Sequence, residues 1–321
     1  MAVSARYLEA VGSDDFDSNE YERRCLGILI PMLNDKNTTE PHDDGLLVSA
    51  LLLRLLDEMT DPAESHLIIR HTVSAPLLLR MRQRSTRHTE LSNAAMTIVL
   101  RQEILVANMV KRPVELLGRD CDIDDGLGSA TDVMWAHRMT AHAARVTNYA
   151  YGSEPRTLDA WDLLWRYLED WDSAKPIAFE PLNETSTESH VGSFPALYYL
   201  SDCAVSGRQY LEICKIILLA HDPRTPSLGL GRLSYLRAQE EKIRNAVRTI
   251  CGIWLSNQEY VPARVLAGLA IGMTGELFTE VNETSRLLEI LLEAERHVGW
   301  PCLKVSPGLR RFWGLEDATT G

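Results

Sequence analysis

The chain has 321 residues, of which 45% are hydrophobic, and it carries a formal net charge of -12. This composition is sufficient for a substantial core and excludes a disordered chain. The negative charge argues against direct nucleic-acid binding, which requires clustered Lys and Arg. No apolar run is long enough to span a membrane, and residues 1–17 lack the apolar core of a signal peptide, so we expect an intracellular protein that does not contact a membrane.

Most of the chain follows the helical period. Residues 1–20 are polar and acidic and predict a loosely held arm. Beyond this arm, apolar residues recur at helical spacing between segments that contain Pro, Gly or Asn. We predict helices over residues 21–33, 45–59, 64–84, 94–117, 131–151, 157–172, 196–222, 231–255, 260–277 and 283–297. Alternating β-type patterns are hard to find, so the predicted fold is all-α, a multi-helix bundle with no sizeable sheet.

The sequence can be divided into an N-terminal part, a helical domain and a short tail. Residues 1–44 would form the N-terminal arm and the first helix, residues 45–314 a helical domain, and residues 315–321 a tail. Within the helical domain, a further boundary is possible in the polar, Pro-containing connector at 175–195. A single helical domain could also hold this connector as a long loop.

The helix predicted over residues 94–117 contains a carboxylate in the middle of its apolar stripe. At about 100° per residue, Glu103 lies among apolar side chains, whereas Arg101 and Arg112 lie on the opposite, polar side. Pro113 is expected to end the helix, because proline disfavours the helical conformation of the residue before it. Glu103 either pairs with an arginine of a neighbouring helix and fixes the packing, or acts as a functional acid or ligand contact.

Neither a metal nor a nucleotide site is predicted. The nearest histidine pairs, such as His137 with His142, are five residues apart and miss the i, i+4 spacing of a metal pair. The acidic loop at 120–125 lacks the EF-hand pattern, and there is no glycine-rich phosphate loop and no GxSxG motif. The cysteines are scattered, as is typical of small buried side chains: Cys25, Cys121, Cys203, Cys214, Cys251 and Cys302. We therefore expect no metal and no cofactor.

Aromatic residues in two segments could line a pocket or fill the core. Trp161 and Trp165 recur at helical spacing, and tryptophans of this kind are more often core than ligand cage. Four side chains between residues 198 and 221 lie among apolar residues and would suit a pocket lining: Tyr198, Tyr199, Tyr210 and His221. The basic run at 80–88 could bind an anion or a partner's acidic face, or form a solvated helix end.

Several phrases follow one another in register along the chain. They are LRQEILVANMVKRPV at 100–114, the Trp- and Asp-rich run at 161–181, FPALYYL at 194–200, ICGIWLSNQEYVPARVLAGLAIGMTG at 250–275, ERHVGWP at 295–301 and FWG at 312–314. Together they resemble the regulatory domain of fungal-specific transcription factors, the helical region that follows a zinc binuclear cluster. The resemblance covers roughly residues 45–314. It implies an all-helical domain for transcriptional control, effector response or dimerisation, often in specialised-metabolite pathways, and it implies no catalytic residue.

The sequence departs from those regulators ahead of this region. They carry a Cys-x2-Cys-x6-Cys cluster with a basic linker, whereas only Cys25 precedes the resembling region here. The printed chain is therefore expected to lack the part that reads DNA. Our first hypothesis is a nuclear regulatory module in a secondary-metabolite pathway, which binds a small hydrophobic effector, a protein partner or a second copy of itself.

The alternative hypothesis is a cytoplasmic, cofactor-free enzyme, a cyclase or pericyclase of the Diels–Alder type in secondary-metabolite biosynthesis. Such catalysis needs no metal, because confining a flexible substrate and placing one hydrogen-bond donor or acid can supply much of the rate. Under either hypothesis the candidates to line a ligand pocket are the same: Glu103, Arg101, His137, His142, Trp161, Trp165, Tyr198 and Tyr199.

Overall fold

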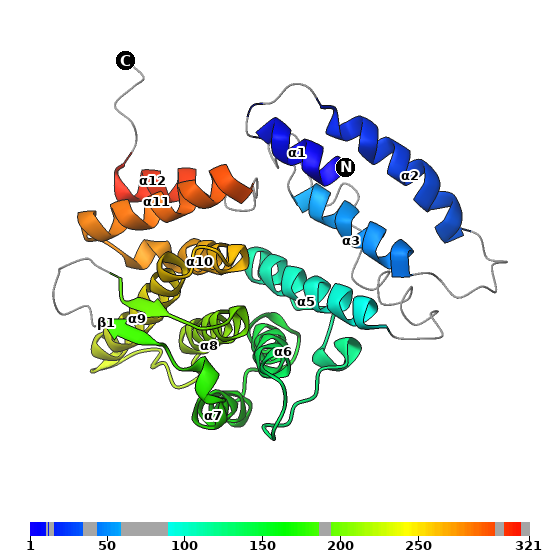
Figure 1. The fold of residues 1–321 in the computed structure, drawn as a ribbon. Helices are drawn as coiled ribbons and strands as arrows, with labels where there is room; N and C mark the ends of the chain where they lie inside the picture. The colour runs from blue at the N-terminus through cyan, green and yellow to red at the C-terminus, as the bar shows by residue number, and fades with distance from the viewer. Residues whose placement is uncertain are drawn as a thin grey trace, which may run out of the picture. The chain divides into compact units, whose positions relative to one another are not determined.

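The computed structural model describes residues 1–10, 12, 16–34, 44–58, 89–185, 194–298 and 305–315 (Figure 1). Within these ranges it contains eleven α-helices, short 3-10 turns and one ribbon of two three-residue strands. The predicted all-α character is confirmed. The helix predicted at 64–84, with the basic run at 80–88, lies outside the described residues. No helix in the described ranges combines the length and apolar character that a bilayer span requires.

The chain divides into two compact units. One consists of Met1–Val99 with Leu292–Lys304, and the other of Leu100–Leu291 with Val305–Gly321. This division falls within helix α5 (Glu90–Val110), and the connector at 175–195 lies inside the second unit. The division predicted at residue 44 stays a prediction.

Three helices pack together in the first unit: α1 (Ala2–Ala10), α2 (Ser18–Asn34) and α3 (Asp44–Glu58). The segment predicted as a loose arm contains α1 instead. Glu9 on α1 accepts hydrogen bonds from the backbone N–H and the hydroxyl of Ser18, both at 2.6 Å. Asp17 caps α2 by accepting from the N–H groups of Asn19 and Glu20. The acidic residues thus join two helices.

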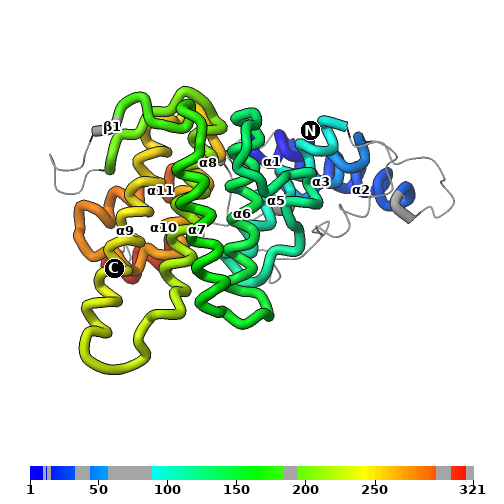
Figure 2. The backbone as a smooth tube through the Cα atoms, turned by 90° about the horizontal axis from the view of Figure 1, so that it is seen from below, coloured from blue at the N-terminus to red at the C-terminus, as the bar shows by residue number. Residues whose placement is uncertain are grey.

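The second unit holds the remaining helices and both strands. They are the end of α5, η1 (Gly118–Cys121), α6 (Asp132–Tyr151), α7 (Leu158–Ala174), η2 (Ile177–Phe179), β1 (Asn183–Thr185), β2 (Ala196–Tyr198), α8 (Asp202–Ala220), α9 (Arg232–Ser256), α10 (Val261–Thr274), η4 (Gly275–Leu277), most of α11 (Val281–Val298) and α12 (Val305–Trp313). Figures 1 and 2 show α8 between α6 on one side and α9 and α10 on the other.

Helix α8 is the centre of the second unit. Of residues 204–219, all but Arg208 and Lys215 are buried, as expected of a helix that is apolar on every side. One of its buried polar side chains joins it to two neighbouring helices: the amide N–H groups of Gln209 donate to the carbonyls of Ile250 on α9 and Ala263 on α10, at 3.2 and 3.0 Å. Gln209 thereby fixes the position of three helices relative to one another.

The tryptophan face of α7 fills the core, as the sequence indicated. Trp161 and Trp171 are buried, whereas Trp165 is half-buried. The indole N–H of Trp171 donates to the carbonyl of Trp135 at 3.1 Å, and its ring packs edge-on against Trp135 and Phe179. The indole nitrogen of a buried tryptophan needs such a partner, and α6 supplies it.

The start of the helix predicted at 196–222 was placed wrongly. Residues 196–198 form β2, which pairs antiparallel with β1, and α8 begins only after Ser201, whose hydroxyl accepts from the N–H of Ala204. The ribbon is anchored to α9, because the N–H of Leu197 donates to Ser256 Oγ at 3.0 Å. Pairing with residues far along the chain thus overrides the local helical pattern.

Gly252 allows α9 to lie against the segment that precedes β2. A Cβ atom at this position would lie 2.1 Å from the carbonyl oxygen of Pro195, which is closer than any real contact. We expect Gly252→Ala to lower the free energy of unfolding by about 1–3 kcal/mol, the usual cost of overpacking. Urea unfolding followed by far-UV circular dichroism measures this change.

The matched control is Gly308→Ala on α12, where an added Cβ meets nothing within 4 Å. Because alanine favours a helix more than glycine does, this variant should be unchanged or more stable by up to about 1 kcal/mol. Equal stability of the two variants would contradict the close approach of Gly252 to Pro195.

Candidate functional site

Glu103 is buried but not isolated. Its side chain is 2% exposed, and Arg112 Nη1 donates to Glu103 Oε2 at 3.1 Å. Arg112 was predicted on the opposite face, which was wrong because α5 ends at Val110 and not at Pro113. Lys111 adopts a left-handed conformation with φ 56°, which ends the helix and lets Arg112 reach Glu103. The ion pair favours a packing role for Glu103.

Arg101, near the middle of α5, has a different environment. It is half-buried, and its Nη1 donates to the hydroxyl of Tyr260 at 3.3 Å. Its Nε–H is buried and has no hydrogen-bond acceptor within the described part of the chain. By contrast, Arg138 and Arg248 reach the carboxylates of Asp124 and Glu283, at 2.9 and 2.6 Å. Among the described residues, the hydrogen-bond partner of the Arg101 guanidinium is therefore the hydroxyl of a tyrosine, whereas the partners of Arg138 and Arg248 include carboxylates.

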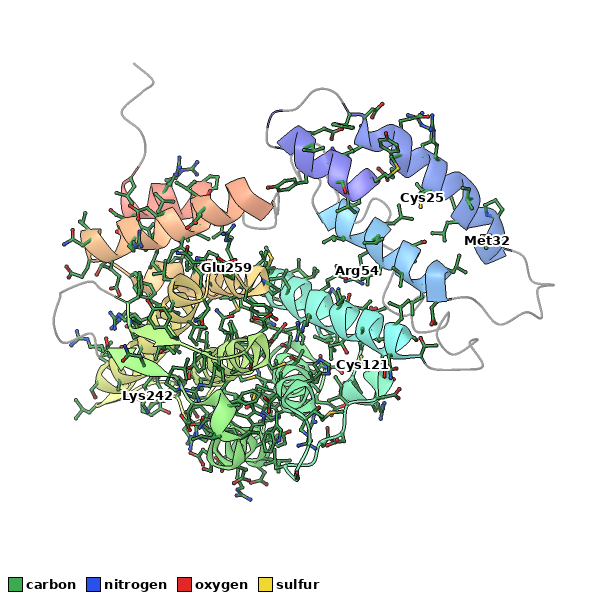
Figure 3. All side chains as sticks on the ribbon, viewed as in Figure 1. Cys25, Met32, Arg54, Cys121, Lys242 and Glu259 are labelled. Atoms are coloured by element: carbon green, nitrogen blue, oxygen red, sulfur yellow. The ribbon has the colours of Figure 1, made fainter. Side chains whose placement is uncertain are left out.

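Tyr260 comes to Arg101 from a distant part of the sequence. It lies at the N-terminal end of α10, next to Glu259, which is labelled in Figure 3. The Tyr260 hydroxyl accepts a hydrogen bond from Arg101, so its own proton remains to be donated to another acceptor. The 159 residues between the two side chains explain why sequence spacing could not join them.

The charge of Arg101 shifts the pKa of three further side chains. Burial, and then the charge of Arg101, lower the pKa of His137 to about 4, so this imidazole is neutral at pH 7. Burial raises the pKa of Tyr210 and of Cys203 above their usual range, and Arg101 opposes both shifts. We call Arg101, His137, Cys203, Tyr210 and Tyr260 the Arg101 cluster. Burial keeps His137, Cys203 and Tyr210 uncharged at pH 7, and the guanidinium of Arg101 supplies the positive charge.

His142 lies in the contact between α6 and α7. Its ring is 1% exposed and stacks on Tyr167 with the ring centroids 4.3 Å apart. Its Nε2 lies 3.1 Å from the carbonyl oxygen of Leu164, and because a carbonyl only accepts, Nε2 carries the proton. Its Nδ1 and the Tyr167 hydroxyl have no hydrogen-bond partner among the described residues.

Trp161 and Trp165 belong to a network at one end of α7. Their rings stack with centroids 5.0 Å apart, and the Arg224 guanidinium lies 3.8 Å from the centroid of the Trp161 ring. The indole of Trp161 donates to the Leu218 carbonyl at 2.8 Å, and Arg224 Nε donates to Asp222 at 2.9 Å. Every one of these contacts is internal, so the two tryptophans are committed to packing.

The two predicted tyrosines lie on the ribbon side of the unit. Tyr198 on β2 is exposed, whereas Tyr199 is half-buried within hydrogen-bond reach of Arg208. Of the eight predicted pocket residues, Arg101 and His137 therefore meet in one cluster, and the other six lie in separate contacts. The sequence indicated Tyr210 as a residue that could line a pocket, but it did not assign Cys203 or Tyr260 to a site.

The structure was also searched for a metal site. Among the described residues, no group of three His, Cys, Asp or Glu side chains could hold a metal ion. Comparison of the chain with protein families, curated proteins and solved structures finds no match. The Arg101 cluster is therefore the candidate site on the contact between Arg101 and Tyr260 and on the electrostatic effect of Arg101 on its neighbours.

The pKa of His142 gives a test of its burial. Burial, and then the charge of Arg145, lower this pKa from 6.5 to about 3. Between these values the unfolded chain binds a proton that the folded chain does not. The contribution of neutral His142 to stability is therefore complete above pH 6.5 and is lost as the pH falls toward 3.

We expect His142→Gln to reduce the pH dependence of the free energy of unfolding by roughly 1 kcal/mol per pH unit between about pH 6 and pH 5. Urea unfolding of the wild type and the variant measures the two slopes. Arg166→Gln, a change of an exposed arginine on α7, is the control and should keep the wild-type slope. Identical slopes for wild type and His142→Gln would contradict the burial of a neutral imidazole.

Proposed function

We propose that this chain is a regulatory module that responds to a small-molecule effector bound at the Arg101 cluster. The observation that carries the proposal is the half-buried guanidinium of Arg101, which contacts a hydroxyl where other arginines of the same unit contact carboxylates. A partly buried charge without a counter-ion is costly. A ligand that brings a negative charge to Arg101 would offset this cost.

The sequence resemblance supports the same proposal. The phrases at 100–114 and 250–275, which resemble the regulatory domain of fungal-specific transcription factors, include Arg101 and Tyr260. Such a domain would act on a secondary-metabolite pathway in the nucleus, alone, as a homodimer or with a protein partner. Because the chain carries a net charge of -12, we assign no DNA contact to it.

A second candidate function is a cofactor-free cyclase or pericyclase acting in the cytoplasm. The same cluster favours it, because a fixed guanidinium and a tyrosine hydroxyl could stabilise negative charge that develops on a carbonyl oxygen. Incubating the purified chain with a pathway intermediate, without any cofactor, discriminates the two. Conversion above the uncatalysed background, lost in Arg101→Gln, would favour the enzyme.

A reporter assay tests the regulatory function. The full chain is fused to an unrelated DNA-binding domain, and reporter output is measured in a fungal host supplied with a panel of organic acids. We expect at least one acid to change the output of the wild-type fusion. Arg101→Gln should remove this response, whereas Arg166→Gln, the same chemical change at an exposed position, should keep it.

The reporter result can also exclude the function. Equal output from the fusion and from the DNA-binding domain alone, under every condition, would mean that the chain carries no regulatory activity. A response that survives in Arg101→Gln would keep the regulatory function but place the effector elsewhere.

A further inference from the structure

We infer that the Arg101 cluster binds the carboxylate of a small aromatic or apolar organic acid. This inference rests on the proposed function, which requires an effector but leaves its chemistry open. It names both the charged group of the ligand and the side chains that hold it.

The positive charge of Arg101 favours a ligand with one negative charge. An arginine guanidinium carries a positive charge in proteins, and burial keeps His137 and Tyr210 uncharged at pH 7. The carboxylates of Asp132 and Asp202 act on Cys203, at one side of the cluster. Arg101 has no ion pair with a carboxylate of the described chain. A monoanion would neutralise the cluster, because the unpaired guanidinium is partly removed from water.

The donors of the cluster fit a planar group with two oxygens. A guanidinium presents its N–H groups as a fork that matches a carboxylate. One of these groups, on Nη1, contacts Tyr260, and the buried Nε–H has no acceptor among the residues that the structure describes. The Tyr260 hydroxyl accepts from Arg101 and can therefore donate its own proton to an anionic oxygen. Arg101 and Tyr260 together can bind both oxygens of one carboxylate.

The neighbouring groups restrict the rest of the ligand. The side chains of His137, Tyr210 and Tyr260 present rings, which favours an apolar or aromatic skeleton. Asp132 and Asp202 act on Cys203 and raise its pKa after burial has done so, which places negative charge near one side of the cluster. A second negative charge on the ligand, as in a phosphate monoester, would be repelled there.

Three matched probes test this inference on the purified full chain by isothermal titration calorimetry: 2-naphthoate, 2-naphthamide and 2-naphthyl phosphate. They share one ring system and differ in charge. We expect 2-naphthoate to bind more tightly than the neutral amide and the phosphate. Arg101→Gln should weaken 2-naphthoate by about tenfold or more, since a charge-assisted hydrogen bond is removed, and Tyr260→Phe should weaken it by a smaller factor.

Two controls keep the result interpretable. Arg166→Gln should leave the affinity for 2-naphthoate unchanged, and thermal unfolding followed by circular dichroism shows whether each variant is folded. Arg101→Lys, which keeps the charge but loses the fork, should bind with an affinity between those of the wild type and Arg101→Gln. If Arg101→Gln is unfolded, the affinities of Arg101→Lys and Tyr260→Phe decide.

Four outcomes would overturn the inference. They are no binding of 2-naphthoate at millimolar concentration, equal binding of 2-naphthoate and 2-naphthamide, tighter binding of the phosphate, or equal loss in Arg101→Gln and Arg166→Gln. Failure here is distinguishable from failure of the regulatory function. If 2-naphthoate binds but the reporter output does not change, the inference is supported and the regulatory function is contradicted. If the reporter responds in a way that does not depend on Arg101, the inference is contradicted and the regulatory function is supported.

Discussion

The second unit depends on the enclosure of α8 by its neighbours. A helix that is buried on almost every side contributes strongly to the hydrophobic stabilisation, and hydrogen bonds from its buried polar groups to neighbouring helices offset the cost of removing those groups from water. Gln209 shows how this is done, because its amide donates to two carbonyls on α9 and α10. The same requirement explains the indole hydrogen bonds of Trp161 and Trp171, which join α7 to α8 and to α6.

Against this background, an unpaired charge is informative. Most arginines of the second unit reach a carboxylate or a carbonyl, including Arg208, which pairs with Asp172. Arg101 instead contacts a tyrosine hydroxyl and imposes its charge on a neutral histidine. Such an arrangement contributes less to stability than an ion pair would. We propose that a negatively charged ligand pairs with Arg101. This pairing would serve either a regulator of transcription or an enzyme.

Local features of the fold could be predicted from the sequence. Thr131 and Thr157 cap α6 and α7 by accepting from the N–H groups of Met134 and Ala160, at the positions where the sequence places helix starts. These caps are properties of four consecutive residues. The burial of Trp161 and Trp171 likewise follows from their helical spacing.

Features that depend on distant residues could not be predicted. The ribbon of β1 and β2 removes residues 196–198 from the helix that their local pattern favours. The left-handed Lys111 ends α5 before Pro113 and brings Arg112 to Glu103. The candidate site depends most on such contacts: Arg101 was identified from the helical pattern, but Tyr260, Tyr210 and Cys203 come from other helices that only the folded chain brings together.

The central claim is that a ligand's carboxylate completes the environment of Arg101. A crystal structure of the full chain grown with 2-naphthoate tests it most directly. The account predicts a carboxylate oxygen about 3 Å from the Arg101 guanidinium and from the Tyr260 hydroxyl. A structure in which Arg101 forms an ion pair with an Asp or Glu side chain of the protein itself would contradict it.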